Sequence, residues 1–445
     1  MSSDDNLHGI GKKAVVSPVS GFPEWLPEQR LVELRWMDDI RRIFESYGFC
    51  SIETPSVEAI EVLLSKGETD KEIYAVQRLL ADDEMSEARL GLHYDLTIPL
   101  ARYVAEHFHD LVFPFKRYQI QRAWRGERPQ EGRYREFSQC DIDVINLDQL
   151  PLQFDAEMPA IIYEILSRLQ VGDFQIRISN RKILEGYFKG LGIEQTTSAI
   201  RLVDKLDKIG KEGVLALLQS DLALPYEVAL RCLALASIHT NDLSFEERVR
   251  ALGVESDLLN EGLEELAFVI DALHTLPRGT LLADLSIARG FDYYTGTVYE
   301  AKLLDFPAYP SICSGGRYDN LAGTFINRKL PGVGISLGLT RLFAKLLAEK
   351  RLLVGPKCPT QVLVIFPRTQ RREEAVRAAN ALRERGLNVE LYHAPTKLAL
   401  QLRYASRKGI PYVWFPPFEE GGVHEVKNMA SEKQEVADPA TWNPT

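Results

Sequence analysis

Two β-prone runs joined by a short charged turn constrain the fold of this chain more than any other feature. The runs cover residues 115–124 and 133–143, and the segment GERPQEG lies between them. Glycine, proline and charged residues between two such runs predict a long antiparallel hairpin. Strand alternation places Arg133, Arg135 and Phe137 on one face of its second strand.

Helical and strand-like segments surround this hairpin. Apolar periodicity and end signals predict helices over 27–47, 98–107, 151–169 and 339–349, and strands over 51–55, 174–179, 281–287, 297–304 and 332–337. Residues 180–275 are predicted to be almost wholly helical, which is typical of a helical insertion. Beyond Gly355 and Pro356, the strand runs VLVIF, LNVELY and YVWF alternate with helices over 371–385 and 397–408, which predicts a βαβαβ unit.

The predicted fold class is therefore α/β, with an α+β body whose antiparallel sheet is flanked by helices. Its predicted segments are an N-terminal arm (1–22), a first part of the body (23–179), a helical insertion (180–275), a second part of the body (276–354) and a C-terminal domain (355–445).

Composition excludes several classes of protein. The five cysteines are scattered, and none lies at metal-ligand spacing from another, so neither a disulfide framework nor a cysteine-based zinc site is expected. No apolar stretch approaches the ~20 residues of a membrane helix. The N-terminus begins with acidic residues and lacks the apolar core of a signal peptide. We therefore expect a cytoplasmic protein with no membrane partner.

Charge is distributed unevenly. The whole chain has a net charge of −10, but residues 356–445 carry 13 Lys+Arg and 10 Asp+Glu, a net of +3. Such asymmetry suggests a polyanionic partner for the C-terminal segment, although a solvated face of an α/β domain fits the charge count equally well.

Three clusters carry residue types suited to a nucleotide or a polar aromatic ligand. The hairpin holds Arg125, Glu127, Arg133 and Phe137; guanidinium groups bind phosphate oxygens and a ring can stack on a base, but an exposed charged hairpin is an equally simple explanation. The segment ARGFDYYTGTVYE (288–300) places two adjacent tyrosines after Arg289. They suit a polar aromatic ligand, and core tyrosines are the commoner case.

The third cluster is GVGISLGLTRL (332–342), where Arg341 falls at the start of a helix whose dipole favours anions. By itself this signal is weak. The sequence contains no phosphate-binding P-loop and no dinucleotide fingerprint. It also contains no G-x-S-x-G motif, so acyl-enzyme chemistry has no support.

These clusters carry a resemblance to the histidyl-tRNA synthetases, which are class II aminoacyl-tRNA synthetases. The helix over 27–47 and the strand before Pro55 look like motif 1, which forms the dimer interface in that family. WRGERPQEGRYREF looks like motif 2, and GVGISLGLTRL looks like motif 3. ARGFDYYTG and the triplet Asp95-Leu96-Thr97 are more specific to the histidine enzymes. The resemblance runs from about Gly21 to the C-terminus.

The resemblance implies a role for each matching residue. For ATP, Arg125 would hold the α-phosphate, Glu127 and Phe137 the adenine, and Arg133 and Arg341 the β- and γ-phosphates. For histidine, Asp95, Thr97 and Gln139 would bind the α-ammonium, Asp143 with Tyr293 and Tyr294 would read the imidazole, and Arg125 would also hold the carboxylate. Arg289 would lie across the α-phosphate, and the catalytic set would be Arg125, Arg289 and Arg341. Arg128 and Gln130 would reach the acceptor end of the tRNA.

The resemblance also implies partners and chemistry. Histidine would be activated with ATP and Mg²⁺ to histidyl-adenylate and pyrophosphate, then transferred to the 3′-terminal ribose of tRNA(His) by a homodimer. The protein itself would supply no metal ligands. Residues 180–275 would clamp the acceptor stem, and residues 355–445 would bind the anticodon. One alternative is a catalytically inactive, histidine-binding regulatory paralogue of histidine biosynthesis. A class II enzyme for another amino acid is the second.

Overall fold

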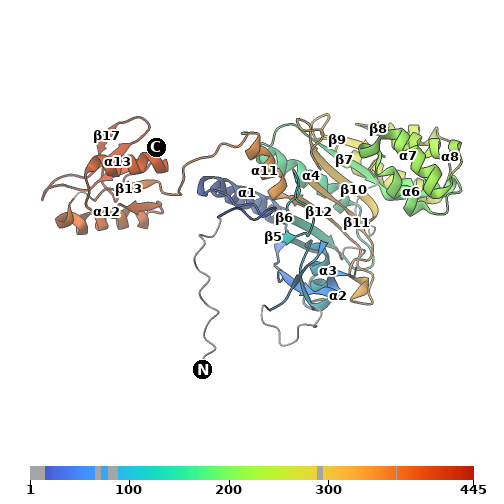
Figure 1. The fold of residues 1–445 in the computed structure, drawn as a ribbon, viewed down its shortest axis with the longest axis horizontal. Coiled ribbons are helices and arrows are strands. Elements are labelled where there is room, and N and C mark those ends of the chain that lie inside the picture. The colour runs from blue at the N-terminus through green and yellow to red at the C-terminus, as the bar shows by residue number, and fades with distance from the viewer. Residues whose placement is uncertain (1–15, 66–71, 79–88, 288–293, 367, 445) are drawn as a thin grey trace, which may run out of the picture. The chain divides into compact units, whose positions relative to one another are not determined.

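The computed structural model describes residues 16–65, 72–78, 89–287, 294–366 and 368–444. The chain divides into two compact units, Met1–Pro23 with Met37–Glu349, and Glu24–Trp36 with Lys350–Thr445. Each unit is built around its own sheet (Figure 1).

The larger unit centres on a nine-stranded sheet in the order β1-β5-β6-β12-β11-β10-β7-β9-β8. All neighbouring pairs are antiparallel except β1 with β5 and β7 with β9. The strands are β1 (Cys50–Ser51), β5 (Phe115–Trp124), β6 (Glu136–Ile145), β7 (Phe174–Asn180), β8 (His239–Thr240), β9 (Leu281–Asp284), β10 (Tyr294–Leu303), β11 (Cys313–Tyr318) and β12 (Gly332–Gly338). A second, small sheet has the order β2-β4-β3. Its strands precede the long hairpin in the chain and are β2 (Val57–Ala59), β3 (Tyr74–Val76) and β4 (Leu90–Leu92).

The predicted hairpin is confirmed, with one correction. β5 and β6 pair from Phe115 with Ile145 to Trp124 with Glu136. The second strand begins at Glu136 rather than Arg133, because Gln130 and Arg133 pair with each other to close a tight loop. Arg133 and Arg135 therefore do not share a strand face with Phe137. The Nε of Arg135 donates to the carbonyl oxygen of Glu127 at 3.2 Å instead.

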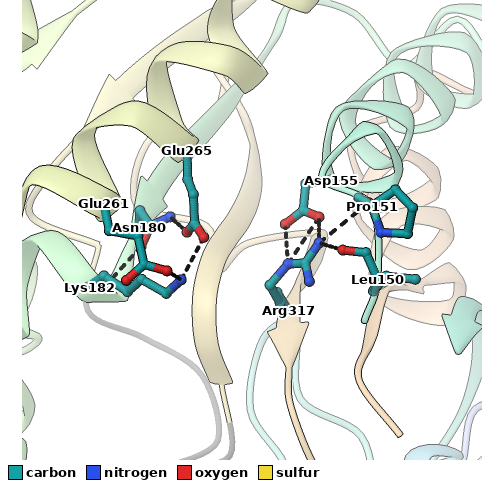
Figure 2. A network of polar contacts seen from close by, with 8 residues as sticks. All are labelled: Leu150, Pro151, Asp155, Asn180, Lys182, Glu261, Glu265 and Arg317. Carbon is teal, nitrogen blue, oxygen red and sulfur yellow. Dashed lines mark hydrogen bonds and ion pairs between the residues drawn. The ribbon is translucent and has the colours of Figure 1, made fainter. Parts of the chain in front are cut away.

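Helices close to the predicted bounds accompany the sheet. They are α1 (Pro27–Ser46), α3 (Thr97–Glu106), α4 (Gln153–Arg168) and α11 (Leu339–Ala348). The sequence did not indicate the short helix α2 (Ile60–Leu63). α4 packs against β7, β10, β11 and β12, and α11 packs against β6. Arg317 of β11 joins its strand to α4, since its Nε lies 3.0 and 3.1 Å from the two carboxylate oxygens of Asp155 (Figure 2).

The segment predicted to be helical contains α5 (Arg181–Gly190), α6 (Thr196–Val203), α7 (Leu206–Leu222), α8 (Tyr226–Ala236), α9 (Phe245–Arg250) and α10 (Asp257–Ala272). α6, α7 and α8 gather at the β7–β9 end of the unit (Figure 1). α5 and α10 instead pack on β10 and β7. Figure 2 shows how Asn180, at the end of β7, caps α5 through Lys182 N at 2.9 Å and donates to Glu265 of α10 at 2.7 Å. One short strand, β8, interrupts the helices and pairs with β9.

The smaller unit contains a five-stranded sheet in the order β14-β13-β15-β16-β17. Its strands are β13 (Val362–Val364), β14 (Val389–Leu391), β15 (Tyr412–Phe415), β16 (Glu425–Asn428) and β17 (Gln434–Val436), with helices α12 (Arg372–Glu384) and α13 (Leu398–Lys408). The first three strands in spatial order are parallel, as the βαβαβ pattern predicts. The sequence did not indicate the antiparallel strands β16 and β17, which extend the sheet.

The two helices of the smaller unit cover opposite faces of its sheet. Ala375, Ala378 and Leu382 of α12 pack with Val362 and Val364. Ala405 of α13 packs with Leu363 of the same strand and with Ile365, which directly follows the strand. Strand alternation therefore buries both faces, which explains why VLVIF and YVWF are continuous apolar runs.

Candidate active site

A single pocket in the larger unit collects residues from the whole length of that unit. It encloses about 910 Å³ of space, part of it open solvent. The residues that line it come from the start of α3, the hairpin, the strands β6, β10, β11 and β12, and the start of α11: Asp95, Thr97, Arg125, Glu127, Gly132, Arg133, Tyr134, Phe137, Gln139, Tyr294, Ser311, Ile312, Cys313, Ser314, Ser336, Gly338 and Arg341. Most of the predicted site residues that the structure describes thus face one cavity.

One end of the pocket is rich in arginine. Arg125 packs its guanidinium 5.0 Å from the ring centroid of Phe137 and donates through Nε to the carbonyl oxygen of Tyr94 at 3.0 Å. Arg133 lies 3.1 Å from a carboxylate oxygen of Glu127. These contacts hold two guanidinium groups in place, which suits them to bind phosphate oxygens.

Arg341 is fixed more firmly than the other arginines of this end. It sits in the first turn of α11, where its Nε donates to the carbonyl oxygen of Gly132 at 2.7 Å and its Nη1 donates to that of Ser311 at 2.6 Å. Burial lowers the pKa of Arg341, and the nearby positive charges of Arg125 and Arg133 lower it further. A phosphate group would relieve this repulsion, so this end of the pocket favours a polyanion.

The hairpin loop presents Arg128 and Gln130 to solvent. Neither side chain lines the pocket, so their predicted contact with the acceptor end of a tRNA stays a prediction.

Another part of the pocket is acidic, around Asp95. The Oδ1 of Asp95 accepts the backbone N–H of Ile98 at 3.1 Å and so anchors the start of α3, next to Thr97. Burial raises the pKa of Asp95 to about 6. Its other oxygen and the Oε1 of Gln139 are buried, and within the described part of the chain neither has a hydrogen-bond partner. Two unpaired acceptors at this point suit an ammonium group, which donates three hydrogen bonds.

A smaller recess adjoins this acidic end, because Thr97, Tyr294 and Ser336 line both cavities. Asp141, Asp143, Tyr318, Gly334 and Ile335 complete its lining. Gln139, Asp141 and Asp143 lie on one face of β6, since side chains two residues apart in a strand point to the same side. The recess thus contains two carboxylates within a buried strand.

Asp143 is already bound by neighbouring strands. Its Oδ1 accepts the hydroxyl of Tyr318 at 2.9 Å, and its Oδ2 lies 2.5 Å from the Nη2 of the fully buried Arg117. Its carboxylate also fills the space in which a Cβ of Gly334 would lie, at 2.1 Å from Oδ1. This contact explains the second glycine of GVGISLG.

Sequence reasoning missed Asp141, Ser336 and Tyr318. Polar side chains at 139, 141 and 143 of a buried strand were a usable signal, because such alternation is unusual unless the polar face lines a cavity. Arg289 and Tyr293 lie outside the described residues, so their predicted places in the site stay predictions.

A mostly antiparallel sheet that presents arginines and carboxylates to one nucleotide-sized pocket matches the class II aminoacyl-tRNA synthetases that the sequence motifs resemble. The family model for histidyl-tRNA synthetase matches residues 21–342, and the model for an anticodon binding domain matches residues 361–440. The chain therefore belongs to the histidyl-tRNA synthetase family.

Individual relatives agree over the full length. A histidine–tRNA ligase of Thermobifida fusca is 60% identical over 428 residues, covering 96% of this chain and 98% of that protein. One of Micrococcus luteus is 50% identical, covering 96% of both chains. The crystal structure of histidyl-tRNA synthetase from a Nostoc species superposes with a TM-score of 0.85 at 39% identity, covering 96% of this chain and 97% of that one. A Bacillus halodurans structure described as an ATP phosphoribosyltransferase regulatory subunit/histidyl-tRNA synthetase shares the fold, with a TM-score of 0.75 at 22% identity.

Proposed function

We propose that this pocket carries out the histidine–tRNA ligase reaction, with ATP at its arginine-rich end and histidine at its acidic end. The observation that carries the proposal is that both ends belong to one cavity: Asp95 and Gln139 line it together with Arg125 and Arg341. An ammonium group and a triphosphate would thereby bind in the same space. The relatives at 50–60% identity over nearly the full chain favour the ligase over the regulatory paralogue.

The first step joins the histidine carboxylate to ATP. A carboxylate oxygen attacks the α-phosphorus, an oxygen–phosphorus bond forms, and the bond to pyrophosphate breaks. No protein nucleophile is needed, because positioning and neutralisation of charge supply the catalysis. Arg125 holds the α-phosphate and the carboxylate, Arg133 and Arg341 hold the β- and γ-phosphates, and Glu127 and Phe137 hold the adenine. Mg²⁺ enters with ATP, whose phosphate oxygens are ligands of the type it prefers.

Arg289 and Tyr293 complete the proposed site by resemblance alone. Arg289 contributes positive charge across the α-phosphate. Asp95, Thr97 and Gln139 hold the α-ammonium, and Asp143, Tyr293 and Tyr294 bind the imidazole ring. A site that hydrogen-bonds both ring nitrogens rejects apolar amino acids strongly, because they would leave its buried polar groups unpaired.

The second step moves histidine to tRNA. The terminal ribose hydroxyl attacks the carbonyl carbon of the adenylate, an ester forms, and AMP leaves with the phosphate oxygen accepting the proton. Arg128 and Gln130 contact the acceptor end, the helical segment 180–275 contacts the acceptor stem, and the smaller unit binds the anticodon. A homodimer formed through α1, working in the cytoplasm, completes the proposal. No helix of the described chain is long and apolar enough to cross a membrane.

Histidine-dependent exchange of labelled pyrophosphate into ATP tests the first step. We expect exchange with histidine and none with the other amino acids. Arg125→Ala and Arg289→Ala should each lower kcat by about 100-fold or more, since each removes charge that stabilises the transition state. Histidine binding without exchange in the unmodified protein would contradict the ligase and support the regulatory alternative.

A further inference from the structure

A path of polar contacts leads from helix α7 to Arg341 at the arginine-rich end of the pocket. It begins at Asp207 in the first turn of α7 and passes through Lys302 and Glu300 of β10. It ends at Ser311, whose backbone carbonyl accepts a hydrogen bond from Arg341. We propose that Lys302 and Glu300 are positioning residues for Arg341, so that the contact between α7 and the sheet contributes to the binding of ATP. The inference rests on the proposed function, in which Arg341 binds the triphosphate.

The strand register places this contact path on the face of the sheet that carries the pocket. Ser336 of β12 lies opposite Ser314 of β11, and Ser314 lies opposite Glu300 of β10. Residues paired across neighbouring strands point to the same face. Ser336 and Ser314 line the pocket, so Glu300 continues the same row towards β7. Lys302, two residues further along β10, points to that face as well.

Glu300 is buried, and its carboxylate reaches two groups on the contact path. Oε1 accepts the hydroxyl of Ser311, and Oε2 lies 3.9 Å from Nζ of Lys302. A buried carboxylate is costly unless hydrogen bonds and an opposite charge compensate it. Glu300 therefore holds Ser311 in place while it depends on the charge of Lys302.

Ser311 connects this carboxylate to Arg341. Its backbone carbonyl accepts Nη1 of Arg341 at 2.6 Å. The carbonyl of the next residue, Ile312, accepts the backbone N–H of Gly338 at 2.9 Å, directly before α11. The guanidinium has further N–H groups with which to bind phosphate oxygens. A displacement of Ser311 would therefore change the direction in which Arg341 presents them.

The other end of the contact path lies on the helical segment, near β7 and β9 (Figure 1). Nζ of Lys302 is 2.9 Å from Oδ2 of Asp207, and Nη1 of Arg177 on β7 is 3.9 Å from the same oxygen. Arg177 also pairs with the buried Asp284 of β9 at 3.3 Å. Charges thus attach α7 to β10, β7 and β9, and Lys302 extends this attachment to Glu300.

The burial of the two pairs predicts which substitution has the larger effect. The side chain of Lys302 is 13% exposed, whereas that of Asp207 is 43% exposed. An exposed ion pair contributes little, but removal of a lysine from a buried carboxylate leaves an uncompensated charge. We therefore expect a larger effect from the loss of Lys302 than from the loss of Asp207.

The test measures KM for ATP and KM for histidine separately in pyrophosphate exchange. Lys302→Met removes the charge and keeps an unbranched side chain. We expect it to raise KM for ATP by about 5-fold, with KM for histidine within about 2-fold of the unmodified protein. Lys302→Arg should restore KM for ATP, because it returns a positive charge of similar reach. Asp207→Asn should raise KM for ATP by about 3-fold.

Lys182→Met provides the matched control. Lys182 is 18% exposed and pairs with Glu261 and Glu265 of α10, so its loss also removes a shielded lysine from two carboxylates (Figure 2). The contact path does not include it, and KM for ATP should stay unchanged. The double variant Asp207→Asn/Ser311→Ala tests continuity, because these residues lie at opposite ends of the path. Independent effects on KM would multiply, and we expect a combined rise smaller than that product.

Three results would overturn the proposal: an unchanged KM for ATP in Lys302→Met, an equal rise of KM for both substrates, or multiplicative effects in the double variant. Calorimetric titration with ATP applies the same criteria without catalysis. Weaker ATP binding in Lys302→Met, in a protein that shows no exchange, would support the contact path and contradict only the ligase. Normal exchange with equal ATP affinity in all variants would contradict only the contact path.

Discussion

At the scale of single residues, burial in the ligand-free pocket disfavours the ionised form of the Asp141 carboxyl group. Burial raises the pKa of Asp141 to about 7, whereas an aspartate in an unfolded chain has a pKa of about 3.9. The folded state therefore binds this proton more tightly than the unfolded state does. The resulting stability is present below about pH 4 and is lost as the pH rises through about 7.

Asp141→Asn should remove this pH dependence. The free energy of unfolding of the variant should exceed that of the unmodified protein by an amount that grows between pH 5 and 7, by at most about 1.4 kcal/mol per pH unit. Urea unfolding without ligands at several pH values measures the difference. Asp257→Asn, an exposed aspartate in the first turn of α10, should give a curve parallel to that of the unmodified protein. A constant difference for Asp141→Asn would contradict the role of burial.

At the scale of elements, the loop between β5 and β6 positions the phosphate end of the pocket. Gly132 has a φ of +73°, and a Cβ there would come within 3.1 Å of the ring and hydroxyl of Tyr309. That hydroxyl donates to the carbonyl oxygen of Arg341 at 2.9 Å, while Arg341 bonds back to the carbonyl of Gly132. The loop and the start of α11 are thus locked together.

Gly132→Ala should displace both the β5–β6 loop and the start of α11, because the added Cβ would contact Tyr309. We expect KM for ATP to rise about 10-fold and the free energy of unfolding to fall by about 1 kcal/mol, because alanine is strained at positive φ. Gly192→Ala is the matched control: Gly192 has a φ of +79°, but nothing lies within 4 Å of its Cβ position, and it is remote in sequence from the pocket. It should lose similar stability with an unchanged KM. An equal effect of both variants on KM for ATP would mean that the contacts between the β5–β6 loop and α11 do not position the phosphate end of the pocket.

At the scale of the whole molecule, we expect exposed arginines of the basic C-terminal unit to contact RNA. Arg403 and Arg407 are exposed one turn apart on α13, and neither has an ion-pair partner within 4.0 Å among the described residues. On α12, which covers the other face of the sheet, Arg377 pairs with Glu374. Unpaired arginines are the better candidates for phosphate contacts.

Replacing Arg403 and Arg407 with alanine should raise KM for tRNA in aminoacylation and leave pyrophosphate exchange unchanged. The slope of log affinity against log salt should fall by about one unit per arginine. Arg377→Ala, on the opposite helix, should change neither quantity appreciably. A normal salt slope in the double variant, with a reduced one in Arg377→Ala, would place the RNA on the α12 face.

Much of this architecture was predictable, because its causes are local. The hairpin, the helices 27–46 and 339–348, and the parallel part of the C-terminal sheet follow from periodicities of two and 3.6 residues and from glycine and proline signals. β16 and β17 were not predictable, since these short segments extend the sheet only by pairing, β16 with β15 and β17 with β16. Arg133 does not lie on the predicted strand face, because it pairs with Gln130 in the loop and β6 begins only at Glu136.

The candidate site, like the fold, was predictable from the sequence only in part. The sequence alone indicated which residues to expect at an ATP and histidine site, because the hairpin and the segment around Arg341 resemble the motifs of the family. Only the tertiary structure decided which carboxylate of β6 is bound by neighbouring strands. Asp141 and Asp143 look alike in sequence, but Asp143 forms an ion pair with Arg117 from β5 and accepts the hydroxyl of Tyr318 from β11, whereas Oδ1 of Asp141 has no hydrogen-bond partner among the described residues. Partners that distant in the chain, and the burial that makes their pairing decisive, exist only in the folded sheet.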